Sequence, residues 1–135
     1  MTMPTDMKAH NAKLIADFRA NGGTPGRPLL LLTTTGARTG QQRTTPMMFI
    51  PDGERLLVMA SNAGAPKDPD WFHNLVAYPD VTVEVTGETF EATAAVLIDD
   101  ERERVFAAVV EQYPMFAEHE ARARRPIPVV ALSRR

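Results

Sequence analysis

The sequence predicts an α+β fold in which about six mostly antiparallel strands form a small closed or split β-barrel. Its apolar segments have the short, alternating pattern of strands, and turn residues separate most of them. These short connections leave no room for the helices that parallel strands require between them. The order of elements therefore disfavours a doubly wound dinucleotide-binding fold.

The first half of the chain contains one helix and three strands. Met7–Asn21 has apolar residues at helical spacing, and Gly22-Gly23 ends the helix. The linker 24–28 contains two prolines and cannot join a strand ladder. Three strands follow, with a turn at 51–54 between the second and the third: Leu29–Thr35, Thr44–Ile50 and Arg55–Ala60.

The second half begins with Ser61–Asp70, an irregular loop of a length that is usually functional. A short helix is predicted at Trp71–Tyr78, with Asp70 as its N-cap and Pro79 blocking its extension. A hairpin of two strands follows, Val81–Val85 and Thr89–Ile98. The next helix is capped by Asp99 or Asp100 and ends at Gln112. A further helix, Met115–Arg124, and a last strand, Ile127–Leu132, complete the chain.

Length and composition limit the classes of protein that the chain can represent. A chain of 135 residues favours a single domain, 1–135, of which 1–23 form the N-terminal helical region. The net charge of −2 predicts no general attraction to nucleic acid. Cysteine is absent and the three histidines are scattered, so no metal site is expected. Without a signal core or a membrane-length apolar run, a cytoplasmic protein is predicted.

The segment Thr33–Pro46 is the most informative part of the sequence. It lies between two apolar runs and contains glycines, several threonines and two arginines, Arg38 and Arg43. A strand, a tight turn and a returning strand would bring these side chains to one rim. Guanidinium groups and hydroxyls suit an anionic ligand, and this chemistry alone does not distinguish phosphate from carboxylate.

Two long motifs resemble those of a known family. Thr34–Pro46 is similar to the pattern TTGRKSGQxRxxPL, and Ala60–Leu75 is similar to ASxGGAxxxPxWxxNL. Tyr113–Phe116 and Arg125–Val130 resemble the C-terminal portion of the same family, the deazaflavin-dependent nitroreductases. The resemblance implies an FMN-binding split-barrel-like fold and the cofactor F420, a 5-deazaflavin with a phosphate and an acidic oligoglutamate tail.

The resemblance also implies which residues bind the cofactor. The family's basic pair, which meets the phosphate and the tail, corresponds to Arg38 and Arg43. Residues that line the ring and the adjoining chain correspond to Thr44, Thr45, Pro46 and Met47. Residues that approach the ring from the next strand, or let the backbone come close, correspond to Ala60, Ser61, Asn62, Ala63 and Gly64. Trp71 and Asn74 match positions near the phosphate arm.

Substrate-facing positions correspond to Tyr113, Phe116 and His119. The family's nitroimidazole-reducing member often has tyrosines there, and only Tyr113 retains the hydroxyl. The resemblance therefore implies an F420H2-dependent oxidoreductase that passes a hydride to quinones, nitroaromatics or other electron-poor acceptors. Ser61 and Tyr113 are the candidates for supplying a proton or stabilising negative charge.

Some alternatives stay open at this level. The chain could bind and carry F420 with little turnover, because two substrate-side hydroxyls are replaced, or it could hold FMN, as related barrels do. Pairing into a homodimer is compatible with the predicted barrel. Weak contact of the N-terminal helix with a membrane surface is also compatible with the sequence, although the helix has few apolar residues.

Overall fold

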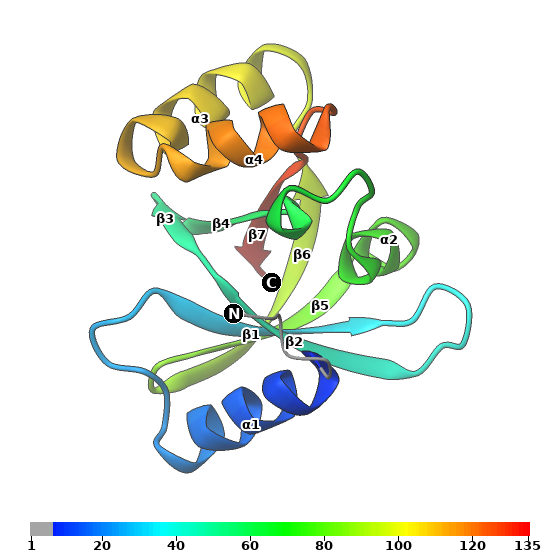
Figure 1. Ribbon diagram of the computed structural model, residues 1–135. Coiled ribbons are helices and arrows are strands. Elements are labelled where there is room, and N and C mark those ends of the chain that lie inside the picture. Colours follow the sequence, from blue (N-terminus) through cyan, green and yellow to red (C-terminus); the bar gives the residue numbers. More distant parts are fainter. Residues whose placement is uncertain (1–6) are drawn as a thin grey trace.

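The computed structural model describes residues 7–135, which contain four α-helices, one short 3-10 helix and seven strands. Most predicted elements are present, with boundaries shifted by a few residues (Figure 1). In chain order the helices are α1 (Met7–Ala20), η1 (Asn62–Gly64), α2 (Asp70–Ala77), α3 (Asp99–Gln112) and α4 (Met115–Ala123). The strands are β1 (Leu29–Thr35), β2 (Gln42–Met48), β3 (Ile50–Asp52), β4 (Arg55–Met59), β5 (Asp80–Val85), β6 (Glu88–Val96) and β7 (Val129–Arg134).

All seven strands form one curled antiparallel sheet in the order β2-β1-β5-β6-β7-β4-β3. The two edge strands, β2 and β3, are separated in sequence only by Phe49. The chain itself therefore connects the two edges of the sheet, which curls into a half-barrel (Figure 1).

The prediction of one strand at Thr44–Ile50 is wrong, because this segment crosses from one edge of the sheet to the other. Its first part pairs with β1 and its last part pairs with β4, so the segment belongs to opposite edges of the sheet. Alternating hydrophobicity indicates that a strand forms, but it does not indicate which strand is its partner. The sheet consequently has seven strands rather than about six.

Two clusters of buried side chains lie on the two faces of the sheet. The first fills the half-barrel and includes Leu30, Leu32, Val83 and Leu132. The second lies beneath α3 and α4 and includes Leu57, Phe106, Phe116, Val129 and Ala131. Successive residues of β7 alternate between the two clusters, as side chains on a strand must. Strand β7, which lies between β6 and β4, therefore contributes side chains to both cores.

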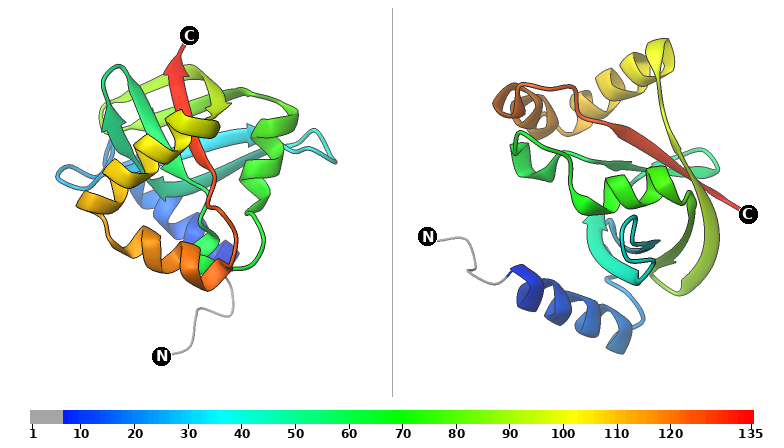
Figure 2. Two further views of the ribbon diagram at one scale, coloured as in Figure 1. Left: turned by 90° about the horizontal axis from the view of Figure 1, so that it is seen from above. Right: turned by 90° about the vertical axis from the view of Figure 1, so that its right-hand side faces the viewer.

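The helices are distributed around the half-barrel. The views in Figure 2 place α3 and α4 together over one side, whereas α1 lies apart from them along β2. Helix α2 contacts β1 and β6. None of the helices in residues 7–135 has the combination of length and apolar character needed to cross a membrane.

Two predicted N-caps are wrong. Asp70 is the first residue of α2, and the N-cap position belongs to Pro69. Ile98 precedes α3, so Asp99 and Asp100 lie inside its first turn and make no capping hydrogen bond. Acidic side chains in a first turn still interact favourably with the helix dipole, which explains why the sequence pattern resembles a cap.

Candidate functional site

The turn between β1 and β2 presents Arg38 at one end of the half-barrel. Within this turn, the Gly36 N–H donates to the Gln41 carbonyl at 2.7 Å, and the Gly40 N–H donates to the Gly36 carbonyl at 2.9 Å. A Cβ on Gly36 would lie 2.8 Å from the Thr39 hydroxyl oxygen and 3.2 Å from the Gln41 carbonyl oxygen, so a larger residue would require the turn to shift. Arg38 lies between Gly36 and Gly40 in this turn and is exposed.

Asn74 of α2 ties this turn to the barrel. Its side-chain oxygen accepts a hydrogen bond from the Ala37 N–H at 2.9 Å, and its side-chain nitrogen donates to the Thr34 hydroxyl at 3.1 Å. Asn74 is 9% exposed and Thr34 is 1% exposed. A buried amide that satisfies its own polar atoms in this way strongly constrains its partners. Helix α2 therefore fixes the position of the arginine-bearing turn.

A cavity of about 1000 Å³ opens beside the turn. Its walls come from α1, the β1–β2 turn, β2 and the start of α2. A space of this size is at the upper end of the range that small-molecule sites usually occupy, roughly 300–1,000 Å³. Six of the residues that the sequence predicts to bind the cofactor line it: Arg38, Arg43, Thr44, Thr45, Trp71 and Asn74.

The unpaired positive charge of this cavity comes from Arg38 and Arg43. Within the described chain, neither guanidinium has a carboxylate partner, whereas Arg19 donates two hydrogen bonds to Glu84 at 3.0 and 2.8 Å. Hydrogen bonding to Glu84 raises the pKa of Arg19. Asp70 adds one carboxylate to the lining. The two free guanidinium groups favour an anionic ligand, because they can form charge-assisted hydrogen bonds with its oxygens.

Helix α1 supplies a wall that sequence reasoning did not predict. Five of its residues line the cavity: Asn11, Ala12, Ile15, Ala16 and Arg19. The sequence gives little signal for this role, because these residues are a mixture of polar and small apolar types. The helix is tied down at its C-terminal end, where the Gly22 carbonyl accepts a hydrogen bond from the Gly87 N–H at 2.9 Å.

The other residues predicted to bind the cofactor lie outside the walls of this cavity. Pro46 and Met47 continue along β2, half-buried, and Met47 packs against the first core. The segment Ala60–Gly64 follows β4 and contacts α4. This packing is close, because a Cβ on Gly64 would lie 3.1 Å from Cδ of Arg122. Their role in binding the ring stays a prediction.

The three predicted substrate-facing residues form a row of rings at α3 and α4. Ring centroids of Tyr113 and Phe116 are 6.5 Å apart, and those of Phe116 and His119 are 5.8 Å apart, both in edge-to-face geometry. Phe116 is only 6% exposed and belongs to the second core. Nδ1 of His119 is buried without a hydrogen-bond partner among residues 7–135. Contact of these residues with a substrate stays a prediction.

A curled antiparallel half-barrel with two unpaired arginines in a cavity at its edge defines a binding protein for an anionic small molecule. The chain belongs to the F420H2-dependent quinone reductase family, whose model matches residues 9–134. This family membership makes it an F420-dependent oxidoreductase, in agreement with the resemblance of its two motifs.

Individual relatives cover most of the chain. It is similar to an F420H2-dependent quinone reductase of Mycobacterium tuberculosis, with 43% identity over 129 residues that span 89% of this chain and 87% of the relative. A solved F420H2-dependent reductase has 37% identity and a TM-score of 0.71, covering 79% of this chain and 95% of its own. Another solved structure, described as a domain-swapped dimer, has 33% identity and a TM-score of 0.73, covering 97% and 100% of the two chains.

Proposed function

We propose that this chain reduces quinones with F420H2 and that Arg38 and Arg43 hold the phosphate and the acidic tail of the cofactor. The observation that carries the proposal is the pair of unpaired guanidinium groups in one cavity. Relatives named F420H2-dependent quinone reductases support the same reaction for this chain.

The residues of the cavity fit the chemistry of the cofactor's anionic arm. Arg38 and Arg43 supply forked donors for phosphate and carboxylate oxygens. Thr44 and Thr45 are half-buried residues that line the same cavity, and their hydroxyls can donate further hydrogen bonds. The Thr44 hydroxyl already bonds to the Thr33 hydroxyl at 2.7 Å, which orients it. An FMN phosphate would use one part of this donor set, whereas a longer acidic tail can use both arginines.

Bound F420H2 supplies a hydride from its ring, and this hydride together with one proton reduces a quinone to a hydroquinone. The chain's own residues must then hold the acceptor, exclude water and stabilise the charge that develops on the quinone oxygen. We assign the last task to Ser61, which is 8% exposed, and to Tyr113. Both carry hydroxyls that can donate a hydrogen bond to that oxygen.

Cofactor binding and turnover test the proposed function directly. Purified protein is titrated with F420, and oxidation of F420H2 is then followed with menadione and with a nitroimidazole as acceptors. We expect saturable binding at micromolar concentrations and faster turnover with menadione. Absence of binding to F420 would overturn the proposal, and binding without any oxidation of F420H2 would indicate a carrier.

Arg43→Ala tests the contact with the anionic arm. We expect it to weaken binding of F420 about tenfold or more, because a charge-assisted contact is lost. It should have much less effect on the deazaflavin core that lacks the phosphate and the tail. Arg104→Ala removes an exposed arginine of α3 and serves as the control. Equal losses for F420 and for the core would show that Arg43 does not meet the arm.

We further propose that the chain forms a homodimer, on the basis of the solved relative described as a domain-swapped dimer. Light scattering coupled to size-exclusion chromatography measures the molar mass. A value near twice 14.9 kDa is expected, and a monomeric mass at all concentrations would refute this part of the proposal.

A further inference from the structure

We propose that Arg125 is a positioning residue that holds the segment Ala60–Asp68 in the conformation required for binding of the cofactor ring. The inference rests on the proposed function, because it assigns the segment, which we call the ring segment, to the F420 site. Arg125 lies about 60 positions away in sequence and takes no part in the arginine pair of the cavity.

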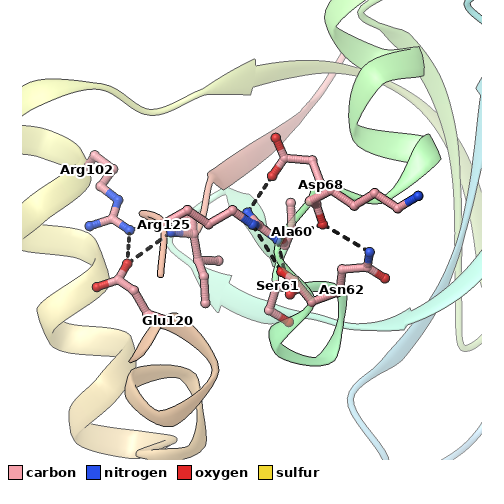
Figure 3. A network of polar contacts seen from close by, with 10 residues as sticks. Ala60, Ser61, Asn62, Asp68, Arg102, Glu120 and Arg125 are labelled. Atoms are coloured by element: carbon pink, nitrogen blue, oxygen red, sulfur yellow. Dashed lines mark hydrogen bonds and ion pairs between the residues drawn. The ribbon is translucent and has the colours of Figure 1, made fainter. Parts of the chain in front are cut away.

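The guanidinium group of Arg125 collects the polar groups of the ring segment around itself (Figure 3). Its side chain donates to one carboxylate and to four backbone carbonyls. The acceptors are Asp68 Oδ1 at 2.5 Å and the carbonyls of Lys67 at 3.0 Å, Ala65 at 3.2 Å, Ser61 at 3.3 Å and Ala60 at 3.4 Å. One side chain therefore fixes the beginning, the middle and the end of the segment.

The ring segment needs such support because its backbone is strained. Asn62, Ala63 and Gly64 have φ values of 50°, 53° and 84°, in the left-handed region that residues other than glycine rarely adopt. Two further hydrogen bonds assist, from the Asn62 side chain to the Lys67 carbonyl at 3.1 Å and from Arg122 to the Ala63 carbonyl at 3.4 Å.

The backbone that carries Arg125 is itself fixed. One oxygen of the Glu120 carboxylate accepts hydrogen bonds from the Ile127 N–H at 3.0 Å and from Arg102 at 2.7 Å. Arg102 also donates to the Ile127 carbonyl at 2.7 Å and is only 9% exposed. Both backbone groups of Ile127 are thus occupied two residues after Arg125. The α3–α4 pair thereby holds the position of the guanidinium and, through it, the ring segment.

A lysine at position 125 would keep the charge but lose the geometry. Its ammonium group has three donors at one point, whereas the guanidinium has five donors spread over a planar fork. It could pair with Asp68 but could not reach four carbonyls at different places. Arg125→Lys therefore separates the positioning role from the simple charge. Arg124→Lys is the matched control, because Arg124 is exposed and its guanidinium makes no hydrogen bond or ion pair within residues 7–135.

The experiment has two readouts, one of which needs no cofactor. Hydrogen exchange of the protein without F420 measures the protection of the amides of residues 61–65, 67 and 68, and titration measures the dissociation constant for F420. For Arg125→Lys we expect exchange of these amides to be about tenfold faster and F420 binding to be about tenfold weaker, with the protection of β1 and β5 unchanged. Arg124→Lys should change neither quantity. In turnover, the KM for F420H2 should rise more than the KM for the quinone.

Each result decides the proposal. Unchanged exchange in Arg125→Lys would overturn it, and so would faster exchange with unchanged F420 binding, because the segment would then lie outside the site. If the native chain fails to bind F420, the proposed function fails. If the native chain binds and Arg125→Lys binds equally well, only the positioning role fails. Should Arg125→Lys not fold, Asp68→Asn replaces it, and unchanged exchange and binding there would overturn the proposal.

Discussion

At the scale of single residues, Asn74 in α2 and Arg125 just after α4 perform related tasks. Asn74 ties the arginine-bearing turn to α2, and Arg125 ties the ring segment to α4. The Asn74 side chain bonds to one backbone N–H and one threonine hydroxyl, and Arg125 bonds to four backbone carbonyls and one carboxylate, so each residue controls the shape of a loop. Loops shaped in this way are where binding residues concentrate on rigid scaffolds.

Asn74→Ala is expected to destabilise the protein by about 1–3 kcal/mol, because the buried Thr34 hydroxyl and the part-buried Ala37 N–H lose their partner. It should also weaken binding of F420, since the turn with Arg38 is no longer held. Urea unfolding and F420 titration measure the two effects. Asn21→Ala, at an exposed asparagine after α1, is the control and should change stability by less than about 0.5 kcal/mol. Full stability in Asn74→Ala would contradict the role assigned to this amide.

At the scale of elements, α1 depends on its C-terminal end for its place at the cavity. Of the α1 residues whose burial is described, only Phe18 is fully buried, so apolar packing holds the helix weakly. The polar contacts gather near its end: the ion pair of Arg19 with Glu84, the Gly87 N–H to the Gly22 carbonyl, and the Thr24 N–H to the Thr86 hydroxyl at 3.0 Å. The remainder of the helix lines the cavity beyond this anchor.

Gly23→Ala tests this anchor. A Cβ at position 23 would lie 2.4 Å from the Cα of Thr86, and φ is +126°, so both backbone strain and a clash with backbone are expected. Gly22→Ala is the control, because φ is +70° there but nothing lies within 4 Å of the added carbon. Gly22→Ala should cost about 1 kcal/mol from strain alone. Gly23→Ala should cost more, increase hydrogen exchange in α1 and weaken F420 binding; equal effects of the two changes would refute the anchor.

At the scale of the whole molecule, the shared strands make the two cores one cooperative unit. Leu57 and Leu132 lie on the paired strands β4 and β7, at 2% and 1% exposure, but they belong to different clusters. Loss of either cluster would leave one face of β7 unpacked. Unfolding of α3 and α4 separately from the half-barrel is therefore not expected.

Leu57→Ala and Leu132→Ala form a matched pair that tests this cooperativity. Each should destabilise the protein by about 2–5 kcal/mol, the usual effect of such a truncation in a core. Far-UV circular dichroism follows all elements, and Trp71 fluorescence follows the first cluster, against which Trp71 packs. In both variants the two signals should shift together with urea. Separate transitions in Leu57→Ala would show that the α3–α4 side unfolds independently.

The sequence by itself determined the types and order of most elements, the antiparallel fold class and the arginine motif. These features are local, because hydrophobic periodicity, glycines and prolines act within a few residues of one another. The family motifs also indicated Asn74 as a site residue, although its two partners lie 37 and 40 positions earlier in the chain.

Only the tertiary structure decided which distant segments meet. It divided the predicted strand at Phe49 between two edges of the sheet and made α1 a wall of the cavity. It also placed Arg125 against backbone carbonyl groups 58–65 positions away. Backbone carbonyls are the same in every residue, so no sequence pattern marks the ones that a guanidinium will bind. Their positions depend on the curvature of the sheet and on the packing of α4, which are properties of the complete fold.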